Sequence, residues 1–251
     1  DDVDLARYAA ELDALWNELG SRINCLITEP YLGGGGSYHP PAAYHQLLLR
    51  WCRQHDVIFI LDEIQANFGR TGPMYAYTKY GVEPDIVCLG KGLGNGVPVS
   101  AAVGRRDILG SLKYGEGSDT WSANPLACAA VLATLDEFEL THVLAHAADM
   151  SHIFTTGLMR LKETGVIARV RGEGMVFGIE CAAVGGMTPE QTAVEIVRRS
   201  YLGNGDTGIH LLGPLAGKVL RISPPLTITA AEANQSLSML YNFVSSMREP
   251  A

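Results

Sequence analysis

Four short apolar runs, separated by stretches with helical spacing, organise the first part of the chain. The runs span residues 23–28, 57–61, 85–89 and 99–103. Apolar runs of this length between helical stretches are typical of parallel strands that helices bury on both faces. Helical spacing runs through residues 3–19, and Pro40-Pro41 begins a second helix that extends to about His55. The sequence therefore predicts an α/β fold with a mostly parallel sheet covered on both faces.

The pattern changes after about residue 140. A long alanine-rich helix begins at Pro125. Beyond it, the periodicity predicts helices at 150–162, 189–201 and 230–247, and strands at 167–171, 175–181 and 219–223. We therefore predict two domains, residues 1–140 and residues 141–251, of which the second is a small α+β domain.

The composition excludes several classes of protein. The 251 residues include 27 acidic and 19 basic side chains, and the net charge of −8 argues against a nucleic-acid groove. No apolar run reaches the roughly eighteen residues of a membrane span, and the start Asp1-Asp2-Val3-Asp4 is unlike a signal peptide. The five cysteines are widely spaced and odd in number, so we expect free thiols in a reducing compartment. We predict a cytoplasmic protein that handles small molecules, with no nucleic-acid or membrane partner.

Lys91 lies in a glycine-rich turn, residues 90–96, directly after the predicted strand 85–89. Open α/β sheets bind ligands at the carboxyl ends of their strands, and glycine lets a flat ligand approach the backbone closely. A free lysine has a pKa of about 10.4, so its use as a nucleophile requires desolvation or a neighbouring positive charge. A Schiff base with a carbonyl cofactor meets this requirement, which makes Lys91 the candidate reactive amine.

A carboxylate is expected close to this lysine. The strand 57–61 ends in Asp62-Glu63, which lies at the same sheet edge as Lys91 if the two strands are parallel. An aspartate at a strand end is often a helix cap. Beside Lys91, however, Asp62 could also keep a pyridine nitrogen protonated, and a protonated ring stabilises a carbanion at an amino-bearing carbon.

Other motifs fit less well. The glycines around Lys91 do not have dinucleotide-binding spacing, and Gly92 stands where a phosphate-binding loop needs serine or threonine. His142 and His146 are four residues apart on a predicted helix, but no glutamate lies between them and no third ligand is evident. We predict no metal site.

Several motifs together resemble the class III pyridoxal-phosphate (PLP) aminotransferases. The central matches are Leu61-Asp62-Glu63-Ile64-Gln65, Phe68-Gly69-Arg70-Thr71-Gly72, Gly81-Val82-Glu83-Pro84-Asp85-Ile86 and Gly90-Lys91. Further matches are Glu29-Pro30, Pro40-Pro41, Thr120, Asn124-Pro125-Leu126, Arg169-Val170-Arg171-Gly172 and Leu220-Arg221-Ile222-Ser223-Pro224-Pro225-Leu226. The resemblance covers nearly the whole chain and implies the fold-type I PLP-transferase fold, with residues 1–140 as the C-terminal part of the PLP-binding large domain.

The resemblance also implies roles for five residues. Lys91 would form the Schiff base with pyridoxal 5′-phosphate and shuttle a proton, and Asp62 would bind the pyridine nitrogen. Gln65 would lie near the 3′ oxygen of the cofactor. Thr120 would bind the phosphate of the neighbouring subunit, which implies a homodimer, and Arg221 would clamp a substrate carboxylate. Without the resemblance, structural roles are the simpler interpretation of Gln65, Thr120 and Arg221.

The implied function is transamination by a ping-pong mechanism. An amine or amino acid would donate an amino group and an α-keto acid would accept it; the sequence does not identify either substrate. An aminomutase, a decarboxylase or a phospho-lyase on the same scaffold remains an alternative. A non-catalytic dimerisation module is a second alternative of a different class.

The chain departs from the family pattern in places. Members that use ω-amino substrates often carry, after the Glu-Pro pair, a glutamate that can pair with the carboxylate-binding arginine; here that stretch is residues 33–36, all glycine. Ala66-Asn67 and Trp121-Ser122-Ala123 also differ from the usual residues. The long portion that precedes the first helix in the family is missing, so we expect a fragment, because that portion supplies the phosphate cradle and the aromatic ring that stacks on the cofactor.

Overall fold

The computed structural model describes residues 3–214 and 216–248, so Asp1-Asp2 of the acidic start lie outside the described residues. The chain forms two compact units. Unit 1 comprises the chain up to Pro30, Pro40–Phe68 and Pro73–Thr141, and unit 2 comprises Tyr31–His39, Gly69–Gly72 and the chain from His142 onward. The main change of unit thus falls next to the predicted boundary, but two short segments from the first half of the chain belong to unit 2.

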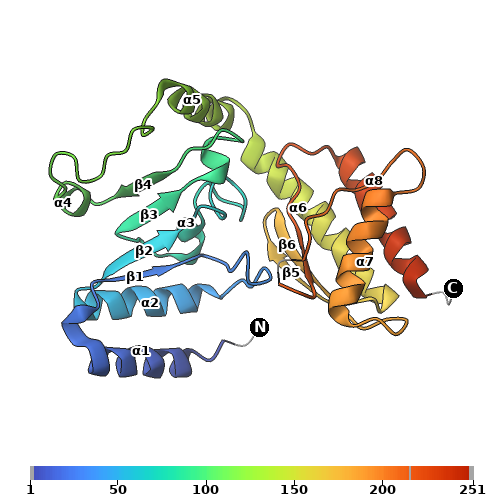
Figure 1. Ribbon diagram of the computed structural model, residues 1–251, viewed down its shortest axis with the longest axis horizontal. Helices are drawn as coiled ribbons and strands as arrows, with labels where there is room; N and C mark the ends of the chain where they lie inside the picture. Colours follow the sequence, from blue (N-terminus) through green and yellow to red (C-terminus); the bar gives the residue numbers. More distant parts are fainter. Residues whose placement is uncertain (1–2, 215, 249–251) are drawn as a thin grey trace. The chain divides into compact units, whose positions relative to one another are not determined.

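Unit 1 contains a four-stranded mixed sheet (Figure 1). Its strands lie in the order β1 (Cys25–Thr28), β2 (Ile58–Asp62), β3 (Ile86–Leu89) and β4 (Ala101–Gly104). The first three strands are parallel, and β4 is antiparallel to β3. The helices of unit 1 are α1 (Leu5–Leu19), α2 (Ala42–His55), α3 (Ala76–Tyr80), α4 (Arg106–Leu109) and α5 (Pro125–Leu140), with 3₁₀ turns at Gly20–Arg22 and Lys91–Leu93.

The two faces of this sheet differ in burial. Phe59 and Leu61 alternate along β2 and are completely buried, and α2 packs against this strand. On the edge strand β1, Ile27 is 58% exposed and Cys25 is exposed as well. Among the described residues, the expectation that helices cover both faces is therefore met only in part.

Asp85, immediately before β3, ties several elements of unit 1 together. Its buried carboxylate accepts hydrogen bonds from Phe59 N–H (2.8 Å), Arg53 Nη1 (2.6 Å) and Arg105 Nη1 (2.9 Å). Burial alone would raise the pKa of Asp85, but the hydrogen bonds from Arg53, Phe59 and Arg105 outweigh it and lower the pKa. Asp85 therefore links α2, β2 and the segment after β4 as an ionised carboxylate.

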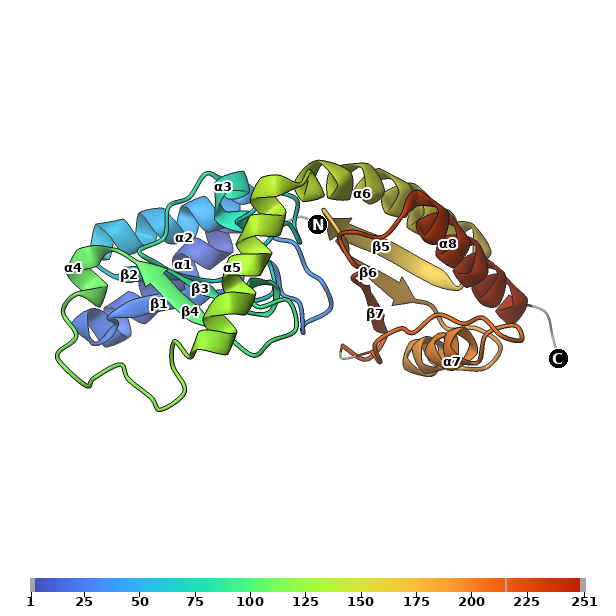
Figure 2. The ribbon, with the colours of Figure 1, turned by 90° about the horizontal axis from the view of Figure 1, so that it is seen from above.

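Unit 2 contains an antiparallel sheet with helices on both sides. The strands β5 (Ile167–Glu173), β6 (Val176–Cys181) and β7 (Val219–Ile222) lie in that order. Figure 2 shows α6 (Val143–Arg160) and α8 (Ala230–Ser245) on one side of the sheet and α7 (Pro189–Leu202) on the other. Short 3₁₀ turns at Leu161–Thr164 and Ser246–Arg248 complete the unit. In the part of the chain that the structure describes, none of the helices has the length and apolar character that crossing a bilayer requires.

The core of unit 2 forms around the central strand β6, where only Glu180 is not fully buried. Residues at helical spacing on α6 pack against it, among them Ala147, Phe154 and Leu158. The helix α6 begins at Val143, earlier than the predicted 150, because Val143 and Ala147 continue its buried stripe toward the N-terminus. Both α7 and α8 begin after a threonine, Thr188 and Thr229, that forms a capping box.

Candidate active site

Asp62 and Lys91 lie at the same edge of the sheet in unit 1. Asp62 is the last residue of β2 and pairs in register with Cys88 of β3. Lys91 follows two residues after Leu89, where β3 ends. Because β2 and β3 are parallel, their carboxyl ends meet at one edge, which is where open α/β sheets bind ligands. The parallel pairing on which the sequence prediction depended is therefore present.

The backbone at Lys91 has an uncommon conformation. Lys91 has a φ of 44°, in the left-handed region, and begins a 3₁₀ turn in which Leu93 N–H donates to Gly90 C=O (3.0 Å). A non-glycine residue held in this region costs about 1–3 kcal/mol, and such strain is concentrated at active sites and ligand clamps. Gly94 cannot carry a side chain, since a Cβ there would lie 2.3 Å from Val97 O. The turn thus holds an exposed lysine in one fixed backbone geometry.

Asp62 has one oxygen engaged and one available. Its Oδ1 accepts a hydrogen bond from Ile64 N–H (3.0 Å), which fixes the orientation of the carboxylate. Its Oδ2 has no hydrogen-bond partner among the described residues. The negative charge of Asp62 adds to the effect of burial in raising the pKa of the Cys88 thiol. A half-buried carboxylate with a free oxygen can accept a hydrogen bond from a protonated ring nitrogen.

Two residues that sequence reasoning did not select hold this edge in shape. Glu63 is completely buried and accepts hydrogen bonds from Ala76 N–H (2.8 Å) and Tyr77 N–H (2.7 Å), although burial raises its pKa against the effect of these bonds. Asn67 is also buried, and its Nδ2 donates to Gly90 O at 3.4 Å. Glu63 thus fixes the turn that follows β2 against the start of α3, and Asn67 joins this turn to the one that carries Lys91.

Gln65 and Thr120 occupy different surroundings. Gln65 is half-buried in the turn after β2, two residues from Glu63. Thr120 lies in a loop in which all residues from 110 to 123 are exposed. No hydrogen bond joins Thr120 to Asp62 or Lys91 among the described residues. Of the predicted set, the structure thus brings Asp62, Gln65 and Lys91 to one region, and it leaves Thr120 on an exposed loop.

Arg221 belongs to unit 2, where it lies in β7 opposite Gly178. With three glycines of the segment 33–36 it lines one small cavity; the lining residues are Gly33, Gly34, Gly36, Leu212, Gly213, Ala216, Val219 and Arg221. The guanidinium has no hydrogen-bond or ion-pair partner among the described residues. The four-glycine segment therefore contributes backbone but no side chain to the surroundings of Arg221.

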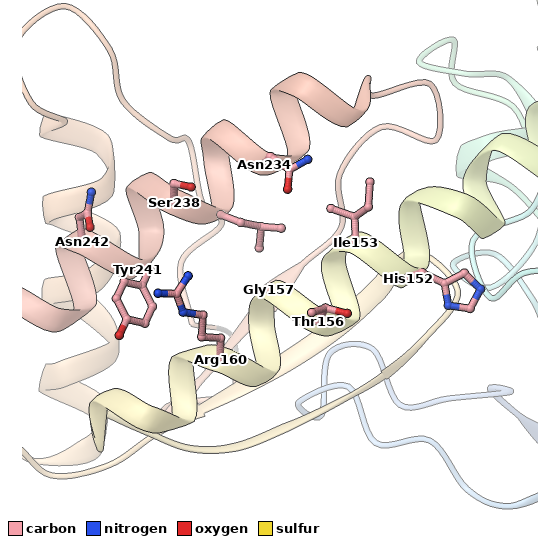
Figure 3. A pocket seen from close by; sticks show the side chains of 10 residues that line it. His152, Ile153, Thr156, Gly157, Arg160, Asn234, Ser238, Tyr241 and Asn242 are labelled. Atoms are coloured by element: carbon pink, nitrogen blue, oxygen red, sulfur yellow. The ribbon is translucent and has the colours of Figure 1, made fainter.

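Two other features of unit 2, a groove and a pair of histidines, do not contain the residues predicted for the active site. Figure 3 shows a groove between α6 and α8 in which the guanidinium of Arg160 stacks on the ring of Tyr241, 4.4 Å from its centroid. None of the five predicted residues lines this groove. Of the histidine pair considered from the sequence, His146 uses Nε2 in a 2.8 Å hydrogen bond with Ile228 O. Among the described residues, no three His, Cys, Asp or Glu side chains form a group that could hold a metal ion.

Comparison with known proteins identifies relatives along almost the whole chain. A family model described as aminotransferase class-III matches residues 2–244. The chain is 35% identical to the acetylornithine aminotransferase of Agrobacterium fabrum over 231 residues, which is 91% of this chain and 54% of that protein. It is 34% identical to the 4-aminobutyrate aminotransferase of Mycobacterium leprae over 216 residues, 86% of this chain and 48% of that protein. The chain thus spans about half the length of the curated relatives it matches.

The solved structures that superpose on this chain are also aminotransferases. The acetylornithine aminotransferase of Elizabethkingia anophelis superposes with a TM-score of 0.84 at 28% identity, over 95% of this chain and 58% of that one. The ornithine aminotransferase of Toxoplasma gondii, in a structure with partial PLP occupancy at its active site, gives a TM-score of 0.85 at 28% identity over 98% of this chain and 56% of that one. The chain has the fold of these enzymes and belongs to the class-III aminotransferase family.

Proposed function

We propose that this protein is a PLP-dependent aminotransferase that moves an amino group from an amine or amino acid to an α-keto acid by a ping-pong mechanism. The observation that carries this proposal is the arrangement at one sheet edge. There, the conformationally restrained Lys91 follows β3, and Asp62, with a free oxygen, ends the adjacent parallel strand β2. Membership of the class-III family supports the same activity. We assign unit 1 to the PLP-binding large domain and unit 2 to the small domain.

The residues present fit pyridoxal phosphate. When bound, this cofactor supplies an aldehyde and a protonated ring that stabilises negative charge on an amino-bearing carbon. The amine of Lys91 would hold the cofactor at its aldehyde carbon and would serve as the base for the proton on the amino-bearing carbon of the donor. The free Oδ2 of Asp62 would accept the ring N–H and keep that nitrogen protonated. The amide of Gln65 would donate a hydrogen bond to the ring oxygen.

Arg221 is the proposed clamp for a substrate carboxylate. A guanidinium binds a carboxylate through two parallel hydrogen bonds, and Arg221 has no acidic partner among the described residues to compete with it. The glycine segment 33–36 adds no side chain to the cavity that Arg221 lines. The named substrates of the relatives, acetylornithine and 4-aminobutyrate, both carry a carboxylate that a short carbon chain separates from the free amino group. We infer that carboxylate-bearing amines are the donors.

A homodimer would complete the site, with Thr120 binding the phosphate of the partner subunit. The exposed loop that carries Thr120 supports this inference. So does α5, which is apolar on all sides over residues 125–133 and exposes Leu126 and Leu132 at 72% and 61%. A helix that is apolar on all sides is normally buried, so a second subunit would cover it. The five unpaired cysteines support a reducing location, for which we propose the cytoplasm.

A half-reaction tests the reaction type directly. The full-length protein, loaded with pyridoxal phosphate, is mixed with a panel of amines in the absence of any keto acid, and the cofactor absorbance is followed. A transaminase transfers the amino group to the cofactor once per site and then stops, because no acceptor is present. Turnover beyond one equivalent per site, or carbon dioxide release, would contradict transamination and favour the other PLP reactions. No reaction with any donor would favour a non-catalytic module.

A further inference from the structure

Arg70 connects two parts of unit 2 that are far apart in the sequence. Its Nη1 donates to Met175 O (2.9 Å) in the β5–β6 turn and to Pro224 O (2.7 Å). Pro224 lies three residues beyond Arg221, in the segment that follows β7. The N–H of Met175 donates in return to Arg70 O (2.9 Å), so the main chain of Arg70 is fixed as well.

The short segment that carries Arg70 fits tightly against the β5–β6 turn. A Cβ on Gly174 would lie 2.5 Å from Gly72 N and 2.7 Å from Arg70 O, closer than any side chain can approach. The carbonyl of Gly174 in turn accepts a hydrogen bond from Ser151 Oγ (2.6 Å) of α6. The segment therefore has little freedom to shift, and the guanidinium of Arg70 holds Pro224 from a fixed position.

The charges around Arg70 are not balanced. Its only hydrogen-bond acceptors among the described residues are neutral carbonyls. Burial lowers the pKa of Arg70; Tyr31 opposes this effect, and the positive charge of Arg221 makes a smaller contribution that lowers the pKa further. By contrast, Arg171 of the same unit pairs with Glu180 at 2.9 Å. The charge of Arg221 thus acts on Arg70, and neither guanidinium has a carboxylate partner among the described residues, an arrangement that an arriving anion stabilises.

We propose that Arg70 is a positioning residue for Arg221: it pins the backbone that follows Arg221 and adds uncompensated positive charge beside it, so that the two arginines together set the preference for carboxylate-bearing substrates. The inference rests on the proposed function, in which Arg221 binds the substrate carboxylate. Arg70 acts through Arg221 and through the local potential, because its Nη1 is occupied by Met175 and Pro224.

The test compares two donors in the half-reaction of the full-length holoenzyme. One is the best carboxylate-bearing donor of the panel, and the other is its analogue without the carboxylate. In Arg70→Gln, the half-saturating concentration of the first donor should rise about ten- to a hundredfold, the range expected when a binding group is misplaced by about an ångström. The maximal rate and the constants for the analogue should change less than about threefold. Arg70→Lys, which keeps the charge but loses the planar fork, should lie in between.

Arg160→Gln is the matched control. It removes one positive charge from the same unit, but at the groove between α6 and α8. It should leave the discrimination between the two donors unchanged. In an Arg221→Gln background, Arg70→Gln should cause a clearly smaller further loss of discrimination than in the wild type, because the backbone that Arg70 pins no longer carries the clamp and only the charge of Arg70 still acts.

The possible failures are distinguishable. A wild-type holoenzyme that reacts with neither donor contradicts the proposed function and the role of Arg70 with it. If the wild type reacts, but Arg70→Gln raises the half-saturating concentrations of both donors equally or of neither, the role of Arg70 alone is overturned. The role is also overturned if Arg70→Gln lowers the discrimination as much in the Arg221→Gln background as it does in the wild type. Thermal melting and the cofactor absorbance of each variant show that it is folded, and if Arg70→Gln does not fold, the same comparison is made with Arg70→Lys.

Discussion

Gly34 can accept a side chain, unlike most glycines near the proposed site. A Cβ at this position meets no atom within 4 Å, and its φ is not in the left-handed region. Gly34 lines the same small cavity as Arg221, whose guanidinium has no partner among the described residues. The position therefore allows a carboxylate to be introduced beside Arg221 without backbone strain.

Gly34→Glu should weaken the binding of carboxylate-bearing donors. A partly exposed ion pair with Arg221 is worth about 1 kcal/mol, so KM for such donors should rise about fivefold. An amine without a carboxylate should be affected little. Gly34→Gln has nearly the same size without the charge and should behave like the wild type. Steady-state kinetics with both donors check this, and an equal effect of Glu and Gln would contradict the proposed role of Arg221.

At the residue scale, the sequence predicts which residues lie at the ends of strands. It does not predict the burial, the hydrogen-bond partners or the backbone conformation of those residues. The sequence placed Lys91 and Asp62 at one sheet edge because apolar runs locate strand ends and parallel strands end at one edge. The adjacent Glu63 was passed over, although its carboxylate is completely buried. Its two hydrogen bonds go to Ala76 and Tyr77, thirteen and fourteen residues away, and no local pattern reveals such partners. The left-handed φ of Lys91 was likewise not evident in the sequence.

Among the elements, the β5–β6 turn and the segment that carries Arg70 are in close backbone contact. Gly174→Ala should destabilise the protein for two reasons: its φ is 56°, and a Cβ would lie 2.5 Å from Gly72 N. The matched control is Gly185→Ala, with a φ of 57° and no atom within 4 Å of a Cβ. We expect a loss of about 1–2 kcal/mol for the control. The clash should add about 1–3 kcal/mol for Gly174→Ala.

Unfolding in denaturant, monitored by circular dichroism, measures the free energy of unfolding of both glycine variants. Equal losses for Gly174→Ala and Gly185→Ala would mean that the segment 69–72 moves away freely. In that case Arg70 would not be held as the structure indicates.

The connection of α2, β2 and β4 through Asp85 should depend on pH. The folded pKa of Asp85 lies below the unfolded value of about 3.9, so its contribution to stability is present above that value and is lost as the pH falls through the folded pKa. Near neutral pH, Asp85→Asn should cost about 1–3 kcal/mol. The difference from the wild type should shrink toward acid pH. Unfolding free energies measured from pH 2 to pH 7 check this, and a difference that is constant over the range would contradict it.

At the element scale, the strands and helices with strong periodicity were predicted well. The order of α1, β1, α2, β2 and β3 follows the apolar runs closely. The antiparallel direction of β4 was not predicted, because it depends on how the chain turns after Lys91 and not on the composition of the strand. The membership of segments 31–39 and 69–72 in unit 2 was not predicted either. It results from single long-range contacts, such as Arg171 Nη2 to Gly36 O at 2.7 Å.

At the scale of the whole molecule, the proposed dimer predicts that Thr120 of one subunit serves the site of the other. If Thr120 serves the site of the partner subunit, then Lys91→Ala and Thr120→Ala homodimers should each be impaired. Mixed dimers of the two variants should regain one intact site, which combines Lys91 of one chain with Thr120 of the other. Activity should therefore rise after the two variants are unfolded and refolded together.

The same mixing experiment has a clear opposite outcome. If Thr120 serves the site of its own subunit, mixed dimers contain no intact site and activity stays at the level of the separate variants. The control is each variant refolded alone at the same total concentration, with sedimentation analysis to show that dimers have formed. A protein that sediments as a fully active monomer would contradict the dimer itself.

The fold of the whole chain could be predicted because motifs along nearly its entire length occur in the same order as in the class III aminotransferases. The family match over residues 2–244 and TM-scores above 0.8 agree with that prediction. The substrate could not be predicted in the same way. Bond selection depends on the complete pocket, and the chain spans about half the length of its curated relatives.

The proposed covalent bond between Lys91 and pyridoxal phosphate can be detected directly. The full-length protein is incubated with the cofactor, reduced with borohydride, digested, and analysed by peptide mass spectrometry. The predicted result is a single reduced phosphopyridoxyl label on the peptide that contains Lys91, absent in Lys91→Arg. A folded holoprotein without label on Lys91, or with label spread over the other lysines, would contradict the proposed role of Lys91.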